Sequence, residues 1–132
     1  MLLFLISQIA RGNSLARALM HYSVKGITLA GAVLDVGGGR GASYLPYLKQ
    51  DKNTEVVGLD LVPSSDIAVQ INFETDPLPR KNASVDQVLM FDILEHIYHH
   101  QFLIAEAARV LSGHTTACSA RGWNRSPDDV IP

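Results

Sequence analysis

The sequence predicts an α/β fold in which a doubly wound, mostly parallel sheet of four to five strands is flanked by helices. Short apolar segments that suit strands alternate with segments whose apolar residues recur at helical spacing. The strand-like segments are mostly apolar, as expected when both faces of a parallel sheet are covered. Right-handed crossovers would bring the carboxyl ends of these strands to one edge of the sheet.

The composition is that of a single globular domain. The 132 residues are 47% hydrophobic and 18% charged, with a formal net charge of −2. These values argue against disorder, and nothing in them suggests nucleic acid or an anionic membrane as a partner. Cys118 is the only cysteine, which excludes an intrachain disulfide and fits a reducing, cytoplasmic location. The apolar residues 1–10 are too short to span a bilayer, so we expect a docked helix without stable membrane insertion.

The first third of the chain is expected to be helical before the sheet begins. Residues 3–22 predict one or two helices broken near residues 12–14, with Asn13 or Ser14 as a cap. The second helix would carry one apolar face, made of Leu15, Ala18, Leu19 and Tyr22. Residues 26–30 are expected to be a connection.

The remaining elements are predicted from apolar runs and breaker residues. The expected strands cover residues 31–36, 55–60, 67–71 and 85–91, and residues 115–119 could add a fifth. A crossover helix is expected over residues 42–49, with Pro46 either kinking it or marking a short first turn. A second helical pattern runs from 93 to 111, with a break near His99. Residues 61–65 and 76–82 are expected to be loops.

The chain is organised around a short apolar strand that ends in four glycines: Gly37, Gly38, Gly39 and Gly41. Glycines permit positive φ and a close approach of a ligand to the backbone. Asp35 lies inside the strand, where a carboxylate is costly unless something compensates it. Arg40 could pair with Asp35, or Asp35 could face a positively charged ligand. We favour the ligand, because open α/β sheets bind ligands at this end of their strands.

Ordered motifs resemble the class I methyltransferases that use S-adenosylmethionine. Residues 33–41 are similar to the first motif of that family, and residues 57–60 to its second strand and terminal acid. Residues 77–79, 84–88 and 92–97 resemble later motifs of the small-molecule subgroup typified by ubiquinone/menaquinone-type methyltransferases. Residues 106–111 match the helix end before the fifth strand. The resemblance covers about residues 30–111 and implies a Rossmann-like fold with S-adenosyl-L-methionine as cofactor.

The resemblance also implies roles for single residues. Asp35 would bind the cofactor's amino group, the glycine loop would lie against its methionine and ribose portion, and Asp60 would accept hydrogen bonds from the ribose. Leu61 would pack on the adenine, Asn72 or Glu74 would meet the adenine amino group, and Asp92 would lie near the methyl group. The expected cofactor-binding residues are Asp35, Gly37, Gly38, Gly39, Gly41, Asp60, Leu61, Asn72, Phe73, Phe91 and Asp92.

The expected reaction is an in-line displacement that carries the methyl group from the sulfonium to a small-molecule acceptor. His96 is the candidate base, because histidine is the most common general base in enzymes; the alternative is a structural histidine at the start of a helix. His96, His99 and His100 have helical spacing, but without further ligands we expect no metal.

Two other functions stay open at this point. The pattern Gly37-x-Gly39-x-x-Ala42, followed by Asp60, also fits an NAD(P)-dependent Rossmann oxidoreductase, although Asp35 would repel a pyrophosphate. The second alternative is a non-catalytic binding or partner subunit. We assign residues 1–111 to a cofactor-binding domain, with residues 1–25 as its N-terminal helical segment, and residues 112–132 to a possible short strand and irregular tail. The terminal strands of the full fold are then missing, and an exposed sheet edge could support an oligomer.

Overall fold

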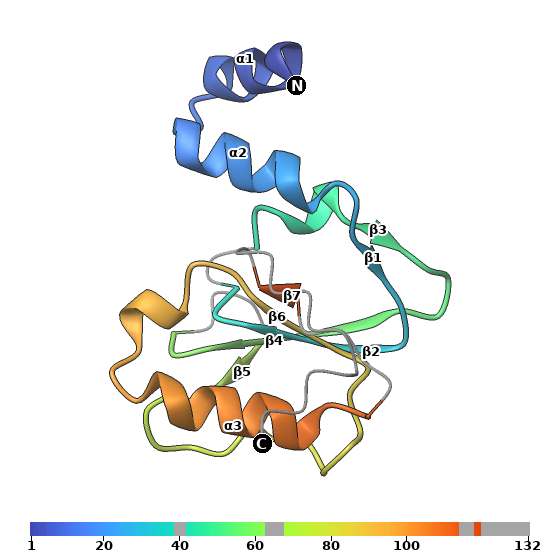
Figure 1. Cartoon of the computed structure of the whole chain (residues 1–132), viewed down its shortest axis with the longest axis vertical. Coiled ribbons are helices and arrows are strands. Elements are labelled where there is room, and N and C mark those ends of the chain that lie inside the picture. Colours follow the sequence, from blue (N-terminus) through green and yellow to red (C-terminus); the bar gives the residue numbers. More distant parts are fainter. Residues whose placement is uncertain (39–41, 63–67, 114–117, 120–132) are drawn as a thin grey trace, which may run out of the picture.

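The expected α/β architecture is confirmed by the computed structural model, which describes residues 1–38, 42–62, 68–113 and 118–119 (Figure 1). Three α-helices and two short 3-10 helices are described: α1 (Leu2–Ala10), α2 (Leu15–Val24), η1 (Leu45–Tyr47), η2 (Leu94–His96) and α3 (His100–Val110). The described strands are β1 (Thr28–Leu29), β2 (Ala32–Val36), β3 (Lys49–Gln50), β4 (Glu55–Asp60), β5 (Val69–Gln70), β6 (Gln87–Met90) and β7 (Cys118–Ser119).

The main sheet is parallel and has the strand order β5-β4-β2-β6-β7. The central strand β2 pairs with β4 on one side and β6 on the other, so that Asp35 lies opposite Gly58 and Leu89. β1 and β3 form a separate two-stranded parallel sheet. The carboxyl ends of β2, β4 and β6 therefore meet at one edge.

Each face of the main sheet has its own core. Leu34 and Val36 of β2 pack on the side of α3, in a cluster that includes Leu103 and Val110. Val33, one residue out of phase, belongs to the opposite cluster, because side chains alternate between the faces of a strand. That opposite cluster contains α2 and the segment after the glycine loop, through Val24, Tyr44 and Leu48. Figure 1 shows α3 on one side of the sheet and the α1–α2 pair at the other end of the molecule.

The two expected N-terminal helices and their break are confirmed. Gly12 has a φ of +86° between them, and the Ser14 hydroxyl caps α2 by accepting a hydrogen bond from the Arg17 amide at 3.2 Å. The expected apolar face of α2 is wrong in part: Ala18 is buried as expected, together with His21 and Val24, whereas Leu15, Leu19 and Tyr22 are exposed. α2 buries the face that carries His21 because this side chain belongs to a hydrogen-bonded cluster, which is described below.

The expected crossover helix over residues 42–49 is also wrong. The chain makes only η1 there and then enters β3, which pairs with β1 inside the expected connection 26–30. Pro46 supplies no amide hydrogen for a longer helix, and Ala42 has a φ of +35°. Leu48 is already extended, with a ψ of 147°, so the segment crosses the sheet mostly as irregular chain.

The later elements follow the expected order with shorter bounds. β4 has the predicted limits, β6 is shortened to four residues, and β5 to two, while residues 63–67 lie outside the described part. The helical pattern breaks at His99 as predicted. Of the predicted fifth strand, residues 118–119 pair with β6; residues 115–117 lie outside the described ranges.

An ion pair holds α3 against the loop before β6. Arg109 donates to both carboxylate oxygens of Glu106, at 2.8 and 2.7 Å, and to the backbone oxygens of Leu78 and Arg80. The Leu78 amide donates in turn to Glu106, at 2.9 Å. Among the described helices, none is long and apolar enough to cross a membrane.

Candidate active site

The carboxyl end of β2 buries the acid that the sequence singled out. Asp35 is only 2% exposed, and its Oδ1 accepts a hydrogen bond from the Tyr44 hydroxyl. Burial raises the pKa of Asp35 to about 6, the bond from Tyr44 opposes the rise, and the charge of Asp60 adds to it. Asp35 is therefore ionised at neutral pH, but only by a small margin.

Tyr44 is the site residue that the sequence reasoning missed. Its ring is buried at 4.5 Å from that of Phe91, and its pKa is raised by burial and by the charges of Asp35, Asp92 and Asp60. Acids from the ends of β2, β4 and β6 thus act on one hydroxyl. A signal existed in the sequence: a buried acid needs a donor, and Tyr44 follows the glycine loop closely. The helix predicted for residues 42–49 does not by itself bring Tyr44 to Asp35.

The first two glycines of the loop leave no room for side chains. Gly37 has a φ of +75°, and a Cβ there would lie 2.6 Å from Cδ1 of Ile93. A Cβ on Gly38 would lie 2.4 Å from Oδ2 of Asp35, so the backbone passes directly over the carboxylate. The other expected loop residues, Gly39 and Gly41, lie outside the described residues, as does Arg40.

The end of β4 presents a second acid. Asp60 accepts a hydrogen bond from the Val62 amide at 3.0 Å, which fixes the turn after the strand. Leu61, expected to pack on an adenine, is 55% exposed. An apolar side chain at that exposure is available to a ligand.

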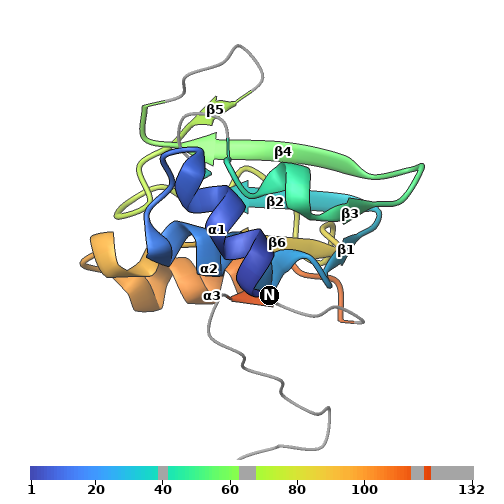
Figure 2. The same cartoon turned by 90° about the horizontal axis from the view of Figure 1, so that it is seen from above.

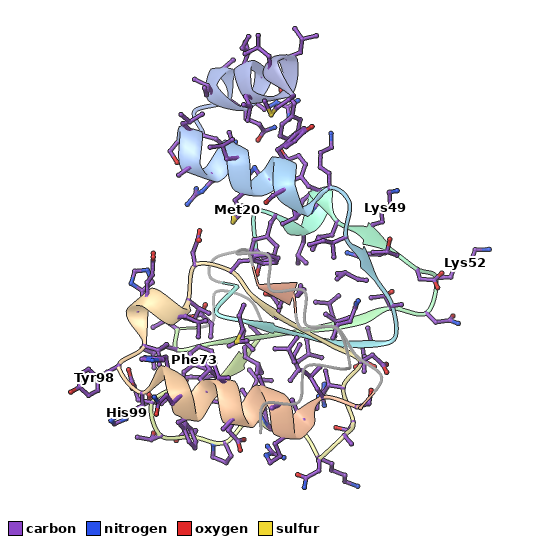
Figure 3. All side chains as sticks on the ribbon, in the orientation of Figure 1. Met20, Lys49, Lys52, Phe73, Tyr98 and His99 are labelled. Atoms are coloured by element: carbon purple, nitrogen blue, oxygen red, sulfur yellow. The ribbon has the colours of Figure 1, made fainter. Side chains whose placement is uncertain are left out.

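The residues expected after the third strand are largely used by the protein itself. Asn72 Oδ1 accepts from the Glu74 amide at 3.0 Å, and Glu74 accepts from the amides of Tyr98 and His99 at 2.7 and 2.8 Å. Phe73 is buried in the core cluster on the α3 side, and Figure 3 shows its side chain near α3.

The end of β6 completes the edge. Phe91 is buried against Tyr44, and Asp92 follows it in an exposed position with a φ of +53°. A non-glycine residue in this left-handed region is uncommon and is often found at functional sites.

The three histidines of residues 96–100 lie on the surface. His96, the expected base, is exposed on η2, with Nε2 3.6 Å from Oε1 of Glu95. His99 Nδ1 lies 3.5 Å from Oε2 of Glu74, and Figure 3 places His99 and Tyr98 at the outer end of α3. Within the described residues, no group of three or more His, Cys, Asp or Glu side chains is placed to hold a metal ion.

The comparison with known families agrees with this geometry. The profile of a family described as "Methyltransferase domain" matches residues 34–116, which is more than half of the chain. The chain belongs to this methyltransferase family. The match begins within β2 and contains the glycine loop, β4 and β6, so Asp35, Asp60 and Asp92 all lie within it. A search of curated proteins found no match.

Solved structures support the fold of this methyltransferase domain. They include a methyltransferase from Haloferax volcanii in complex with the Trm112 methyltransferase activator, with 22% identity and a TM-score of 0.58 over 77% of this chain and 49% of that one. A SAM-dependent methyltransferase from Aquifex aeolicus has 21% identity and a TM-score of 0.56, over 80% of this chain and 66% of that one. The domain thus spans about half to two thirds of the length of these structures.

Proposed function

We propose that this methyltransferase domain binds S-adenosylmethionine at the edge formed by β2, β4 and β6, and that it transfers the methyl group to a small-molecule acceptor. The observation that carries the proposal is the meeting of Asp35, Asp60 and Asp92 at the carboxyl ends of three adjacent parallel strands, with Tyr44 donating to the buried Asp35. Such an edge favours a ligand with positive charge, because burial and the charge of Asp60 raise the pKa of Asp35. S-adenosylmethionine carries both an ammonium and a sulfonium.

The residues present fit this cofactor. Asp35 offers a buried carboxylate to an ammonium, and Gly37 and Gly38 leave the backbone bare beside it. Asp60, at the end of the neighbouring strand, offers oxygen acceptors for a ribose diol. The cofactor would supply an electrophilic methyl group on sulfur. We therefore propose Asp35, Gly37, Gly38, Asp60, Leu61, Phe91 and Asp92 as described members of its site, with Gly39, Gly41, Asn72 and Phe73 retained as predictions.

The same acids weaken the case for an NAD(P)-dependent oxidoreductase. A dinucleotide would lay its pyrophosphate against the glycine loop, next to Asp35. The ionised carboxylate would repel that group, and the low polarity around a buried acid would strengthen the repulsion. No feature of the described residues favours the dinucleotide over S-adenosylmethionine.

The protein's own part in the reaction is to bind, orient and exclude water. The ionised carboxylate of Asp35 would hold the ammonium of the cofactor. Tyr44 fixes this carboxylate by donating to its Oδ1, and Phe91 packs against the ring of Tyr44. His96 is proposed to accept a proton from the acceptor, since its exposed imidazole can meet a molecule docked beyond Asp92. A fixed orientation of the reactants can supply much of the rate enhancement.

The acceptor and the partners are proposed from likeness alone. The motifs at residues 77–79 and 92–97 resemble the ubiquinone/menaquinone-type subgroup, which suggests a small organic acceptor. One similar structure contains an activator protein, which suggests that a protein partner could complete the acceptor site of this domain. In that case the domain alone would bind the cofactor without turnover.

Titration calorimetry tests the binding proposal. S-adenosylhomocysteine, the product of the reaction, is expected to bind near neutral pH, whereas NAD is expected not to. Asp35→Asn should abolish or strongly weaken this binding, and Asp86→Asn, a matched change at the other end of β2, should leave it intact. Binding of NAD but not of S-adenosylhomocysteine would overturn the proposal. His96→Gln should leave the affinity unchanged and lower turnover once an acceptor is known.

A further inference from the structure

The α1–α2 pair carries an apolar surface that the site at the sheet edge does not use. Figure 1 shows the pair at one end of the molecule with α1 outermost, and Figure 2 shows α1 in front of α2 when this end is viewed directly. Leu3 is 84% exposed and Ile6 54% exposed. We call the outward surface of the pair the hairpin face; its exposed apolar residues are Leu2, Leu3, Ile6, Ile9, Leu15, Leu19 and Tyr22.

α1 exposes more apolar side chains than an ordinary surface helix. The polar Gln8 is buried and Phe4 and Leu5 are half-buried, whereas Leu2, Leu3, Ile6 and Ile9 are exposed. Surface helices of globular proteins place the apolar stripe against the core and the polar side in water. An outward apolar stripe of several residues marks a surface that contacts something other than water.

A hydrogen-bonded cluster fixes this orientation. Gln8 Oε1 accepts from the side-chain Nδ2 of Asn13 at 3.0 Å and from the Tyr47 hydroxyl at 3.1 Å. It also lies 3.0 Å from His21 Nδ1. His21 is stacked on Tyr47, and its Nε2 lies 3.2 Å from the Ser43 hydroxyl. Rotating α1 about its axis to bury the apolar stripe would break these contacts and leave buried polar groups without hydrogen-bond partners.

The charge of this region is opposite to that of the rest of the chain. Residues 1–34 contain Arg11, Arg17 and Lys25 and no acidic residue, whereas all 13 acids lie in residues 35–132, which have a formal charge of −5. The three basic residues are exposed. The total of −2 therefore hides a basic, apolar pair of helices attached to an acidic body. The expectation that no anionic membrane is a partner rested on that total.

We propose that the hairpin face is a peripheral docking surface for an anionic lipid bilayer. Amphipathic helices lie in the plane of a membrane interface when exposed apolar side chains enter the acyl boundary and basic residues meet anionic headgroups. The acidic body would be repelled from the same surface, which orients the molecule with α1 toward the lipid. A symmetric pairing of two hairpin faces would instead place the basic residues of both copies together, which disfavours a second copy as occupant.

Sedimentation with lipid vesicles tests the proposal on the full chain. Binding is expected to vesicles of phosphatidylcholine that contain a third of phosphatidylglycerol, to weaken with salt, and to be much lower with phosphatidylcholine alone. Leu3→Ser combined with Ile6→Ser should weaken binding about tenfold or more. Arg11→Gln combined with Arg17→Gln should weaken it about fivefold per charge.

Matched variants separate the hairpin face from the rest of the surface. Ile104→Ser removes an exposed apolar side chain of α3, and Arg80→Gln combined with Lys81→Gln removes two exposed charges from the loop before β6; neither should change vesicle binding. Circular dichroism reports whether each variant is folded. Two results would overturn the proposal: binding that no hairpin variant weakens, or no binding to anionic vesicles. A dimer in size-exclusion chromatography that Leu3→Ser with Ile6→Ser dissociates, without vesicle binding, would assign the face to a second copy.

Discussion

The two ends of β2 are built from the same parts and differ in what those parts do. At the amino end, Gly31 has a φ of +70°, and a Cβ there would lie 2.0 Å from Oδ2 of Asp86. At the carboxyl end, Gly37 has a φ of +75°, and a Cβ on the next glycine, Gly38, would lie 2.4 Å from Oδ2 of Asp35. Each end thus places a glycine backbone over a carboxylate.

The carboxylates differ in their surroundings. Asp86 is exposed and accepts hydrogen bonds from the Ala32 amide at 2.9 Å and the Ser112 hydroxyl at 3.4 Å. Asp35 is buried and accepts a hydrogen bond from the Tyr44 hydroxyl, and its pKa is raised to about 6. Asp86 therefore ties the start of the strand to β6, whereas Asp35 is held at a cost that a cationic ligand would offset. A glycine beside an acid therefore indicates a binding site only weakly until the burial of the carboxylate and its hydrogen-bond donors are known.

The largest expected effect is a loss of stability at the amino end. Gly31→Ala should lower the free energy of unfolding by about 2–4 kcal/mol, because alanine is strained at positive φ and its Cβ would collide with Asp86. Urea denaturation measures the change. The affinity of the folded fraction for S-adenosylhomocysteine should not change, since the binding edge is at the other end of the strand.

Gly38→Ala is the matched change at the carboxyl end. Gly38 does not have a positive φ in the left-handed range, so the backbone tolerates alanine and the loss of stability should be smaller than for Gly31→Ala. The new Cβ would push the Asp35 carboxylate aside, and affinity for S-adenosylhomocysteine should be lost. Equal effects of both variants on binding would contradict the division of β2 into a structural and a functional end.

The next effect is that of Asp35→Asn, which should increase stability and weaken ligand binding. Asp35→Asn should raise the free energy of unfolding near neutral pH by up to about 3 kcal/mol, the equivalent of the rise of the pKa from 3.8 to about 6. It should weaken binding of S-adenosylhomocysteine about 10- to 100-fold, as expected for one lost charge-assisted hydrogen bond. Asp86→Asn should do the reverse, lowering stability with binding unchanged. Thermal unfolding with and without ligand separates the two outcomes.

The sequence was sufficient for the sheet because its strands are apolar and end at acids, glycines or loops. β2, β4 and β6 and their common edge follow from that pattern alone. Local patterns could not reveal that Tyr44 would donate to Asp35 or that Phe73 would join the core under α3, because both depend on which segments meet in three dimensions. The helix predicted for residues 42–49 failed for the same reason: tertiary contacts of Tyr44 and Leu48 prevailed over a weak local preference. The exposure of the apolar residues of α1 could not be predicted, because the residue that the fold buries there, Gln8, is polar.

The pH dependence follows from the raised pKa of Asp35. The native state binds this proton more tightly than the unfolded state, so the group's contribution to stability is fully present below its ordinary value of 3.8 and is lost as pH rises through about 6. The stability difference between the wild type and Asp35→Asn should therefore change across this range and be constant above it. Binding of S-adenosylhomocysteine should weaken about tenfold for each pH unit below 6, as Asp35 becomes neutral. A flat calorimetric profile between about pH 5 and pH 7 would contradict the assigned role.

The smallest expected effect comes from Tyr44→Phe. The phenylalanine keeps the contact with Phe91 but removes the donor to Asp35, so the pKa of Asp35 should rise further, because the bond from Tyr44 opposes the rise caused by burial. The midpoint of the pH dependence of binding should shift upward, with a loss of about 1 kcal/mol in affinity near neutral pH. Tyr98→Phe, at the exposed outer end of α3, is the control and should leave the midpoint in place. If Tyr44→Phe binds more tightly at the unchanged midpoint, its hydroxyl competes with the ligand's ammonium for Asp35 and does not support it.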